Sequence, residues 1–190
     1  AVRLENFEEG SRWYPGAGLY RNVHVITTNK DHFPVWGTYV TTPEINDEFA
    51  RVNVRTKIEQ AEGISENVSY KLKSSIIDPE GNAVAETESY LTKFDLGELQ
   101  QTLIVEYPKL WDIKQPNLYK VNSVLTRIES EETVEGSKTT KVEYARVVDE
   151  YTTTFGIRTI EIIADEGFFL NGRKVKFQGV CLHHDLGPLG

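Results

Sequence analysis

The segment ARVNVRTKI (Ala50–Ile58) sets the fold class of this chain. From Ala50 onward every second side chain is apolar or small, and the side chains between them are Arg, Asn, Arg and Lys. Such alternation turns one face of an extended strand toward a core and the other toward water. The segment is therefore expected to be a half-buried strand of an antiparallel sheet.

Similar segments follow along the chain. Val68–Leu72 alternates in the same way, and Asp78–Asn82 has the Asp-Pro-Glu-Gly-Asn composition of a turn. Further strands are predicted at Ala83–Thr92, Leu99–Tyr107, Leu118–Ile128 and Lys141–Thr154. Six or seven short strands without helical periodicity predict an all-β fold, an immunoglobulin-like β-sandwich. The charged segment Glu129–Lys138 is expected to form a mobile hairpin loop between the last two strands.

The segments that flank this pattern point to neighbouring domains. Ala1–Phe7 and Tyr20–Ile26 are two short predicted strands, too few for a domain of their own. After the last sandwich strand, Gly156–Asp165 is expected to be a linker that leaves the sandwich, partly extended through Ile157, Ile160 and Ile162. The chain contains no methionine, so it is expected to be a piece cut from a longer protein.

A hairpin is predicted beyond the linker, in FFLNGRKVKFQGVCLHHD (Phe168–Asp185). Its Asn171-Gly172 pair lies between apolar flanks and predicts a type I′ turn, which needs positive φ at both central residues. The returning strand is expected to run through Phe177 and Val180 to the His-His-Asp cluster at 183–185. Because α/β barrels present such clusters at the carboxyl ends of strands, the hairpin is expected to open a catalytic barrel.

The composition excludes several classes of partner. The chain has 190 residues, a net charge of −8 and a single cysteine. The negative charge argues against nucleic acid and anionic membranes, which both attract clustered Lys and Arg. One cysteine cannot build a disulfide framework within the chain, and no apolar run approaches the ~20 residues of a membrane span.

Four separated segments resemble family 2 glycoside hydrolases, in particular the β-galactosidase-like members. They are SRWYPGAGLYRNV (Ser11–Val23), LWDIKQPNLY (Leu110–Tyr119), FGIRTIEI (Phe155–Ile162) and the Phe168–Asp185 hairpin. The resemblance implies three parts in order. Residues 1–30 would end a jelly-roll sugar-binding domain, residues 31–164 would be the immunoglobulin-like sandwich, and residues 165–190 would begin a (β/α)₈ barrel, the TIM-barrel catalytic domain.

The resemblance also implies which residues contact sugar in the longer enzyme. His183 occupies the place of a histidine that hydrogen-bonds a sugar hydroxyl, although a histidine that only caps the strand end is the alternative. Many members read Asn-Arg-His-Glu where residues 181–184 of this chain read Cys-Leu-His-His. His184 and Asp185 are weaker candidates, because adjacent strand residues face opposite ways. Arg12 lies on a loop that in the family reaches over the barrel mouth, where a guanidinium can bind hydroxyls.

The resemblance implies no catalytic residue within this chain. A retaining glycosidase needs two carboxyl groups about 5–5.5 Å apart, and in the family both are glutamates on later barrel strands. The chain is therefore expected to be an inactive part of an enzyme that removes terminal β-galactosides, or related β-glucuronides or β-mannosides. Its partners would be the carbohydrate substrate and the jelly-roll and barrel domains of the same polypeptide.

No metal or cofactor is expected in these 190 residues, because consecutive His-His-Asp side chains cannot converge on one ion. The resemblance leaves a divalent cation open to the longer enzyme. Trp36, Trp111 and Tyr119 are expected in the sandwich core or in a seam between domains. The alternative from another class is a free-standing carbohydrate-binding or adhesion module, which would bind sugar on Trp13 and Tyr14.

Overall fold

The computed structural model describes Arg3, Glu5 and residues 22–60, 65–92, 97–135 and 138–180, with the backbone alone at Glu135 and Lys138. The chain divides into two compact units. One unit is Thr28–Val175, and the other combines Ala1–Thr27 with Lys176–Gly190. The ten strands of the described residues all lie in the first unit, and no helix is present among them.

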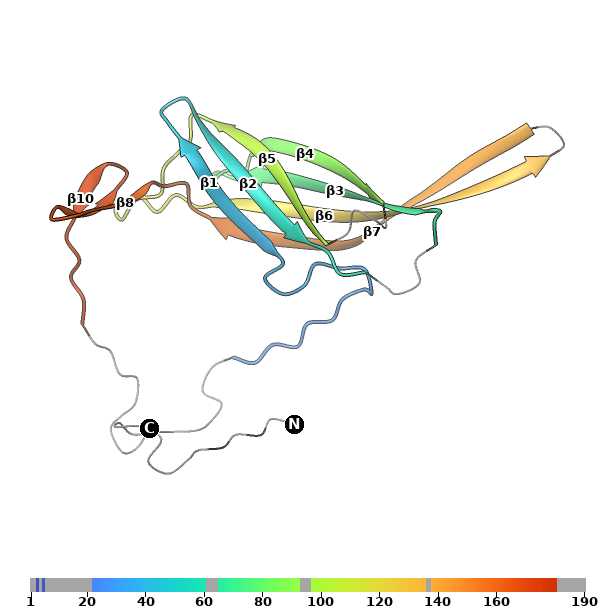
Figure 1. Cartoon of the computed structure of the whole chain (residues 1–190), viewed down its shortest axis with the longest axis horizontal. Helices are drawn as coiled ribbons and strands as arrows, with labels where there is room; N and C mark the ends of the chain where they lie inside the picture. The colour runs from blue at the N-terminus through green and yellow to red at the C-terminus, as the bar shows by residue number, and fades with distance from the viewer. Residues whose placement is uncertain are drawn as a thin grey trace. The chain divides into compact units, whose positions relative to one another are not determined.

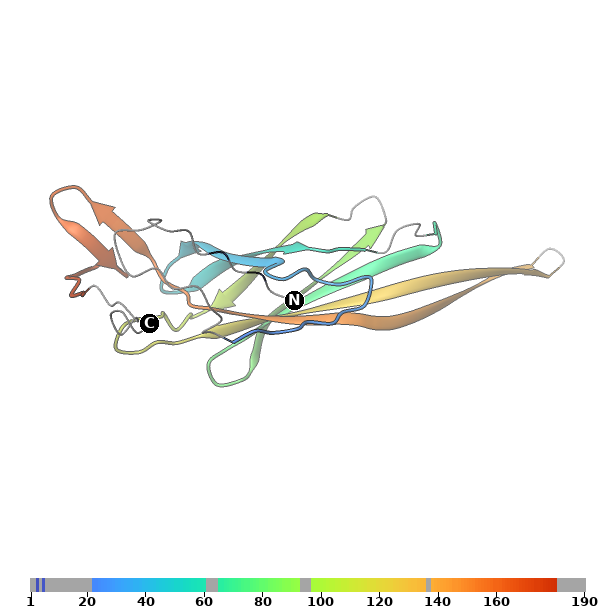
Figure 2. The same cartoon turned by 90° about the horizontal axis from the view of Figure 1, so that it is seen from below.

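The strands form three antiparallel sheets (Figure 1). In chain order they are β1 (Thr38–Ile45), β2 (Phe49–Lys57), β3 (Val68–Ile77), β4 (Ala83–Thr92), β5 (Glu98–Glu106), β6 (Tyr119–Glu135), β7 (Lys138–Phe155), β8 (Ile160–Ile163), β9 (Gly167–Leu170) and β10 (Arg173–Val175). The sheet orders are β1-β2-β5, β4-β3-β6-β7 and β10-β9-β8. The first two sheets pack face to face as the expected immunoglobulin-like sandwich (Figures 1 and 2).

The alternation in β2 has the consequence predicted from the sequence. Ala50, Val52, Val54 and Thr56 are fully buried at 0% exposure, whereas Arg55 on the opposite face is exposed. The predicted bounds of β4 are confirmed without change, and those of β2 and β5 shift by one residue. Strand periodicity depends only on sequence neighbours, so these elements could be located without tertiary information.

A polar layer divides the core into two apolar clusters, one around Val52 and Val121 and the other around Tyr70 and Leu125. Between them lies Gln101 of β5, whose Nε2 donates to the Leu72 carbonyl oxygen at 3.2 Å. The Ser74 hydroxyl of β3 donates to Gln101 Oε1 at 2.7 Å. A buried amide must find partners, so these bonds favour one register between the two sheets.

The charged segment Glu129–Lys138 is not the mobile loop that its composition suggests. β6 and β7 stay paired beyond the last β3 partner, Val68↔Glu129, as far as Glu135↔Lys138. Figure 1 shows this two-stranded ribbon extending past the other strands of its sheet. Cross-strand pairs such as Glu132 opposite Lys141 supply opposite charges that stabilise the ladder. The prediction was wrong because composition does not reveal which residue faces which.

Two further sequence predictions fail at the ends of the described chain. Residues 22–26 are not in a strand, so the predicted strand Tyr20–Ile26 is wrong over its described part. β10 ends at Val175, and the expected continuation through Phe177 and Val180 is wrong. The predicted strand Ala1–Phe7 lies outside the described residues except for Arg3 and Glu5. Residues 22–26 and 176–180 include apolar side chains, but these residues lie in no strand.

A short strap, defined as Asn29–Phe33, ties the chain to the open edge of β7. Asn29 Nδ2 donates to the Val148 carbonyl oxygen at 2.5 Å, and the Phe33 N–H donates to Asp149 Oδ2 at 2.7 Å. Val148 is an extra residue in the β6–β7 ladder, where the register shifts. Bulges expose unpaired backbone groups at a sheet edge, and here the strap uses one of them.

Candidate functional site

The four candidate sugar-contacting residues, Arg12, His183, His184 and Asp185, lie outside the described residues. The structure describes instead the junction at which the hairpin that leads toward three of them joins the sandwich. The junction is defined as the loop Leu110–Asn117, the exit segment Gly156–Thr159 and the hairpin turn with Arg173. Its geometry shows how the start of the hairpin is held.

The exit segment is part of the packed structure, which the linker predicted for Gly156–Asp165 did not include, whereas the extended conformation expected around Ile160 and Ile162 is confirmed as β8. Ile157 is fully buried in the sandwich core, and its carbonyl oxygen accepts the Trp111 N–H at 2.8 Å. A Cβ at Gly156 would lie 2.8 Å from Trp111 Cβ, so only glycine fits this close approach. β8 then pairs with β9 along its whole length. Long-range pairing and burial, which local composition does not show, make the segment ordered structure.

Asn171 joins three segments through one side-chain amide. Its φ of 50° and the φ of 71° at Gly172 confirm positive φ at both central residues of the predicted turn. Asn171 Oδ1 accepts the Thr159 N–H at 3.0 Å, and Nδ2 donates to the Trp111 carbonyl oxygen at 3.0 Å. The Asn171 N–H donates to the Thr159 carbonyl oxygen at 3.0 Å. The turn is therefore fixed both to the exit segment and to the sandwich loop.

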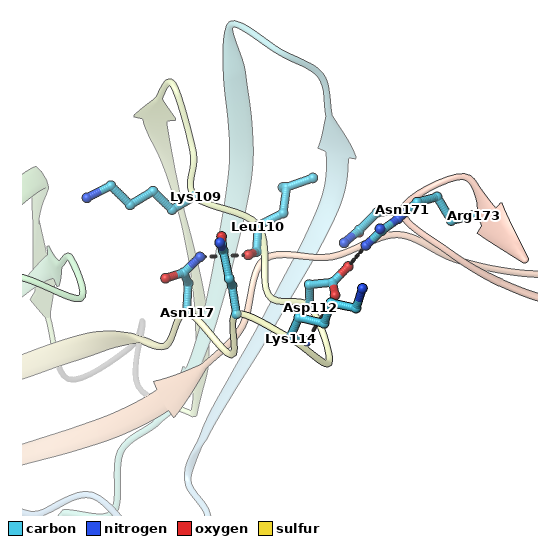
Figure 3. Close-up of a pocket in the computed structure, with 8 residues that line it drawn as sticks. Lys109, Leu110, Asp112, Lys114, Asn117, Asn171 and Arg173 are labelled. Atoms are coloured by element: carbon cyan, nitrogen blue, oxygen red, sulfur yellow. Dashed lines mark hydrogen bonds and ion pairs between the residues drawn. The ribbon is translucent and has the colours of Figure 1, made fainter. Parts of the chain in front are cut away.

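Charged side chains add a second connection between the loop and the hairpin. Arg173 forms an ion pair with Asp112, as Figure 3 shows. The Lys114 N–H donates to Asp112 Oδ1 at 3.1 Å, and this bond together with Arg173 lowers the pKa of the Asp112 carboxyl. On the exit segment, the Arg158 guanidinium lies 5.2 Å from the centre of the Trp111 ring, within range of a cation–π contact.

A cavity of about 670 Å³ opens beside the junction (Figure 3). Its lining consists of one aliphatic side chain, three cations, three amides and one carboxylate: Leu110, Lys109, Lys114, Arg173, Gln115, Asn117, Asn171 and Asp112. Glycoside hydrolysis by two carboxyl groups needs a second acid beside Asp112, and no other acid lines this cavity. Among the described residues no three His, Cys, Asp or Glu side chains cluster as a metal site would require. The described part of the junction supplies groups that can position the hairpin.

The aromatic residues expected in the core or a seam take three different positions. Tyr119 is buried in the core at 2% exposure, and burial raises the pKa of its phenol. Trp111 is half-buried in the junction. Trp36 is 88% exposed, so it does not belong to the core of the described residues. The sequence alone could not separate these positions, because each residue lies within an apolar or aromatic stretch.

Sequence reasoning identified the Asn171 turn but not the role of the Asn171 side chain. The turn itself would accept either asparagine or glycine. The one signal for a further role of Asn171 is that its side-chain amide carries both a hydrogen-bond donor and an acceptor. Neighbouring residues in the sequence predict neither the Arg173–Asp112 ion pair nor the close contact between Trp111 and Gly156. Their partners come from segments far apart in the sequence.

Replacing Asn171 by glycine is expected to lower the free energy of unfolding by about 1–3 kcal/mol, because the Trp111 carbonyl and the Thr159 N–H both lose a partner. Glycine keeps the positive φ, so the loss would report the amide. Asn171→Asp retains the acceptor for the Thr159 N–H but places a carboxylate oxygen against the Trp111 carbonyl oxygen, so its loss should be at least as large as that of Asn171→Gly. Urea unfolding followed by tryptophan fluorescence measures the change.

Gly172→Asn provides the matched control. Asparagine tolerates positive φ, and a Cβ at position 172 meets nothing within 4 Å, so its effect should stay within about 1 kcal/mol. An Asn171→Gly chain as stable as the unaltered chain would show that the amide bonds do not hold the junction.

Comparison with known proteins gives a consistent result. Residues 35–158 match the family model described as glycosyl hydrolases family 2. The β-galactosidase BoGH2A of Bacteroides ovatus is 41% identical over the whole chain, which covers 21% of that protein. A putative β-glucuronidase of Formosa agariphila is 33% identical over the whole chain, which covers 16% of that protein. The chain thus spans about a fifth of the length of these relatives.

A solved structure supports the fold assignment. A family 2 glycosyl hydrolase of Bacteroides cellulosilyticus superposes with a TM-score of 0.71 at 34% identity, and the match covers 93% of this chain and 23% of that one. A β-glycosidase of Bacteroides vulgatus gives a TM-score of 0.69 at 27% identity over 94% of this chain and 20% of that one. No helix of the described residues is long and apolar enough to cross a membrane.

Proposed function

This chain belongs to family 2 of the glycosyl hydrolases, and on that premise we propose that it is part of a retaining, exo-acting enzyme that removes terminal β-linked sugars. The observation that carries the proposal is the match of residues 35–158 to the family together with 41% identity to a β-galactosidase across the whole chain. β-Galactosides are the proposed substrates. β-Glucuronides are the runner-up, because one of the similar proteins is a putative β-glucuronidase.

Within that enzyme, the sandwich is proposed to act as a rigid spacer between a sugar-binding domain and a catalytic barrel. Two observations support this role. The strap Asn29–Phe33 ties the incoming chain to β7, and the junction ties the outgoing hairpin to the sandwich loop through Asn171. A spacer of this kind would keep both neighbours in a fixed relation, which catalysis by positioned groups requires.

Arg12, His183, His184 and Asp185 are proposed to contact the sugar in the longer enzyme. Imidazole and guanidinium groups donate hydrogen bonds to hydroxyls, and contacts to the sugar that strengthen in the transition state contribute to catalysis. No catalytic carboxylate is proposed within this chain. A divalent cation is proposed only as an option of the longer enzyme, with no ligand among the described residues.

The test compares the 190-residue chain with the longer polypeptide that contains it, both prepared from a host without its own β-galactosidase. The longer polypeptide is expected to hydrolyse a nitrophenyl β-galactoside faster than the corresponding β-glucuronide. The chain alone should show no turnover above the uncatalysed rate, because it lacks the pair of glutamates that the proposal places on the barrel.

Hydrolysis by the chain alone would contradict the spacer role. Failure of the longer polypeptide on both substrates would contradict the proposed enzyme class. Saturable sugar binding to the isolated chain in calorimetric titration would instead favour a carbohydrate-binding module.

A further inference from the structure

Like Tyr107, which is 76% exposed and has a φ of 46°, Trp36 combines an exposed aromatic side chain with a left-handed backbone. Its side chain is 88% exposed, and its backbone has a φ of 59°. A bulky residue in the left-handed region is strained, and this conformation persists only where the surrounding structure enforces it. Exposure leaves the indole with little packing inside the chain to offset that strain.

The turn that carries Trp36 is rigid. The Gly37 N–H donates to the Pro34 carbonyl oxygen at 2.7 Å, and the Lys57 N–H donates to the Gly37 carbonyl oxygen at 2.7 Å. A Cβ at Gly37 would lie 2.7 Å from the Pro34 oxygen, so glycine is required for this close approach. The turn, which precedes β1 in the chain, is thus fixed to β2. It holds the indole exposed at the surface.

Two side chains close to Trp36 in the sequence, one aliphatic and one aromatic, are also exposed. Val35 is 60% exposed and Tyr39 is 58% exposed. The Arg55 guanidinium lies 5.0 Å from the Tyr39 ring centre, and Arg55 Nε lies 3.2 Å from a Glu98 carboxylate oxygen. The cation that contacts Tyr39 is therefore already paired with a carboxylate.

We propose that Trp36 is an anchor that inserts into an apolar recess on a neighbouring domain of the same polypeptide, outside these 190 residues. This inference rests on the proposed function, which makes the chain part of a longer enzyme. The chain covers 21% and 16% of the length of two relatives. Most of the surface against which the sandwich could pack in the longer polypeptide would therefore lie outside these 190 residues. Tryptophan on a preorganised turn is the kind of residue that dominates binding energy at protein interfaces.

The proposal predicts opposite effects of Trp36→Asn in two settings. In the 190-residue chain, asparagine relieves backbone strain at little cost in packing, so the Tm should rise by about 2–4 °C. In the longer polypeptide, the same change removes the anchor, and the Tm of the sandwich should instead fall by several degrees. Tyr90→Thr, at an exposed tyrosine of β4, is the control and should change neither midpoint by more than about 1 °C.

Acrylamide quenching gives a second readout that does not depend on variant stability. The Trp36 signal is the difference in fluorescence between the unaltered protein and Trp36→Phe. That signal should be fully accessible to quencher in the chain and protected at least threefold in the longer polypeptide.

Equal accessibility in both settings, or a fall in Tm in the isolated chain, would overturn the proposal. So would an indole signal in the isolated chain that responds to oligosaccharide, because the occupant would then be a sugar. These readouts are independent of glycoside turnover, so failure of the anchor can be told apart from failure of the proposed enzyme class.

Discussion

The chain that carries Arg127→Met is expected to lose about 3–5 kcal/mol of unfolding free energy, because the carboxylate of Asp31 stays buried without its cation. Arg127 Nη1 lies 2.8 Å from Asp31 Oδ2. The Asp31 side chain is 4% exposed and the Arg127 side chain 19% exposed. Water therefore cannot replace the lost partner without local opening.

Tyr70 and Glu129 lie beside the Arg127–Asp31 pair. Tyr70 is fully buried beside it, and burial together with the nearby Asp31 charge raises the pKa of the Tyr70 phenol to about 12. Arg127 also places its Nε 2.9 Å from a Glu129 carboxylate oxygen. Because Asp31 belongs to the strap, the variant should loosen the strap before the rest of the sandwich unfolds.

Denaturant unfolding measures this loss, and an exposed ion pair supplies the control. Arg51 Nε lies 2.9 Å from Glu44 Oε2, but the two side chains are 44% and 48% exposed. Arg51→Met should therefore cost no more than about 1 kcal/mol. Asp31→Asn combined with Arg127→Met should recover part of the loss, since no charge remains buried. Equal effects of Arg127→Met and Arg51→Met would show that the pair is not buried in solution.

The second large effect is expected for Ile157→Ala. This substitution should lower the free energy of unfolding by about 2–5 kcal/mol, because it creates a cavity in the core. Ile157 has 0% exposure and packs in the core cluster with Val121 and Tyr119. Its carbonyl oxygen also accepts the Trp111 N–H. The residue therefore links the exit segment to the sandwich core as well as filling space.

Ile162→Ala is the matched control, because Ile162 is the same residue type in the adjoining strand β8 but is 82% exposed. Its effect should stay within about 0.5 kcal/mol. Thermal and urea unfolding of both variants, with limited proteolysis of the exit segment, separate the two outcomes. If Ile157→Ala were no more damaging than Ile162→Ala, the exit segment would be a linker after all.

Much of the sandwich could be predicted because its signals are local. Alternation in Ala50–Ile58 located β2, and the Asn171-Gly172 pair located a turn with positive φ at both positions. Both signals involve residues close in sequence, where side-chain direction and turn geometry follow directly from the backbone. The charged residues of the β6–β7 ribbon gave no such signal, because their stabilising partners come from the opposite strand.

The sequence by itself located β2, β4, β5 and the Asn171-Gly172 turn, since period-two burial and turn chemistry depend on adjacent residues. Only the tertiary structure decided what holds the sandwich to its two connecting segments. The amide of Asn171 finds Trp111 across 60 residues, and Asp31 finds Arg127 across 96. Hydrogen bonds and buried ion pairs of this kind require both partners in fixed positions, and chain topology alone brings them together.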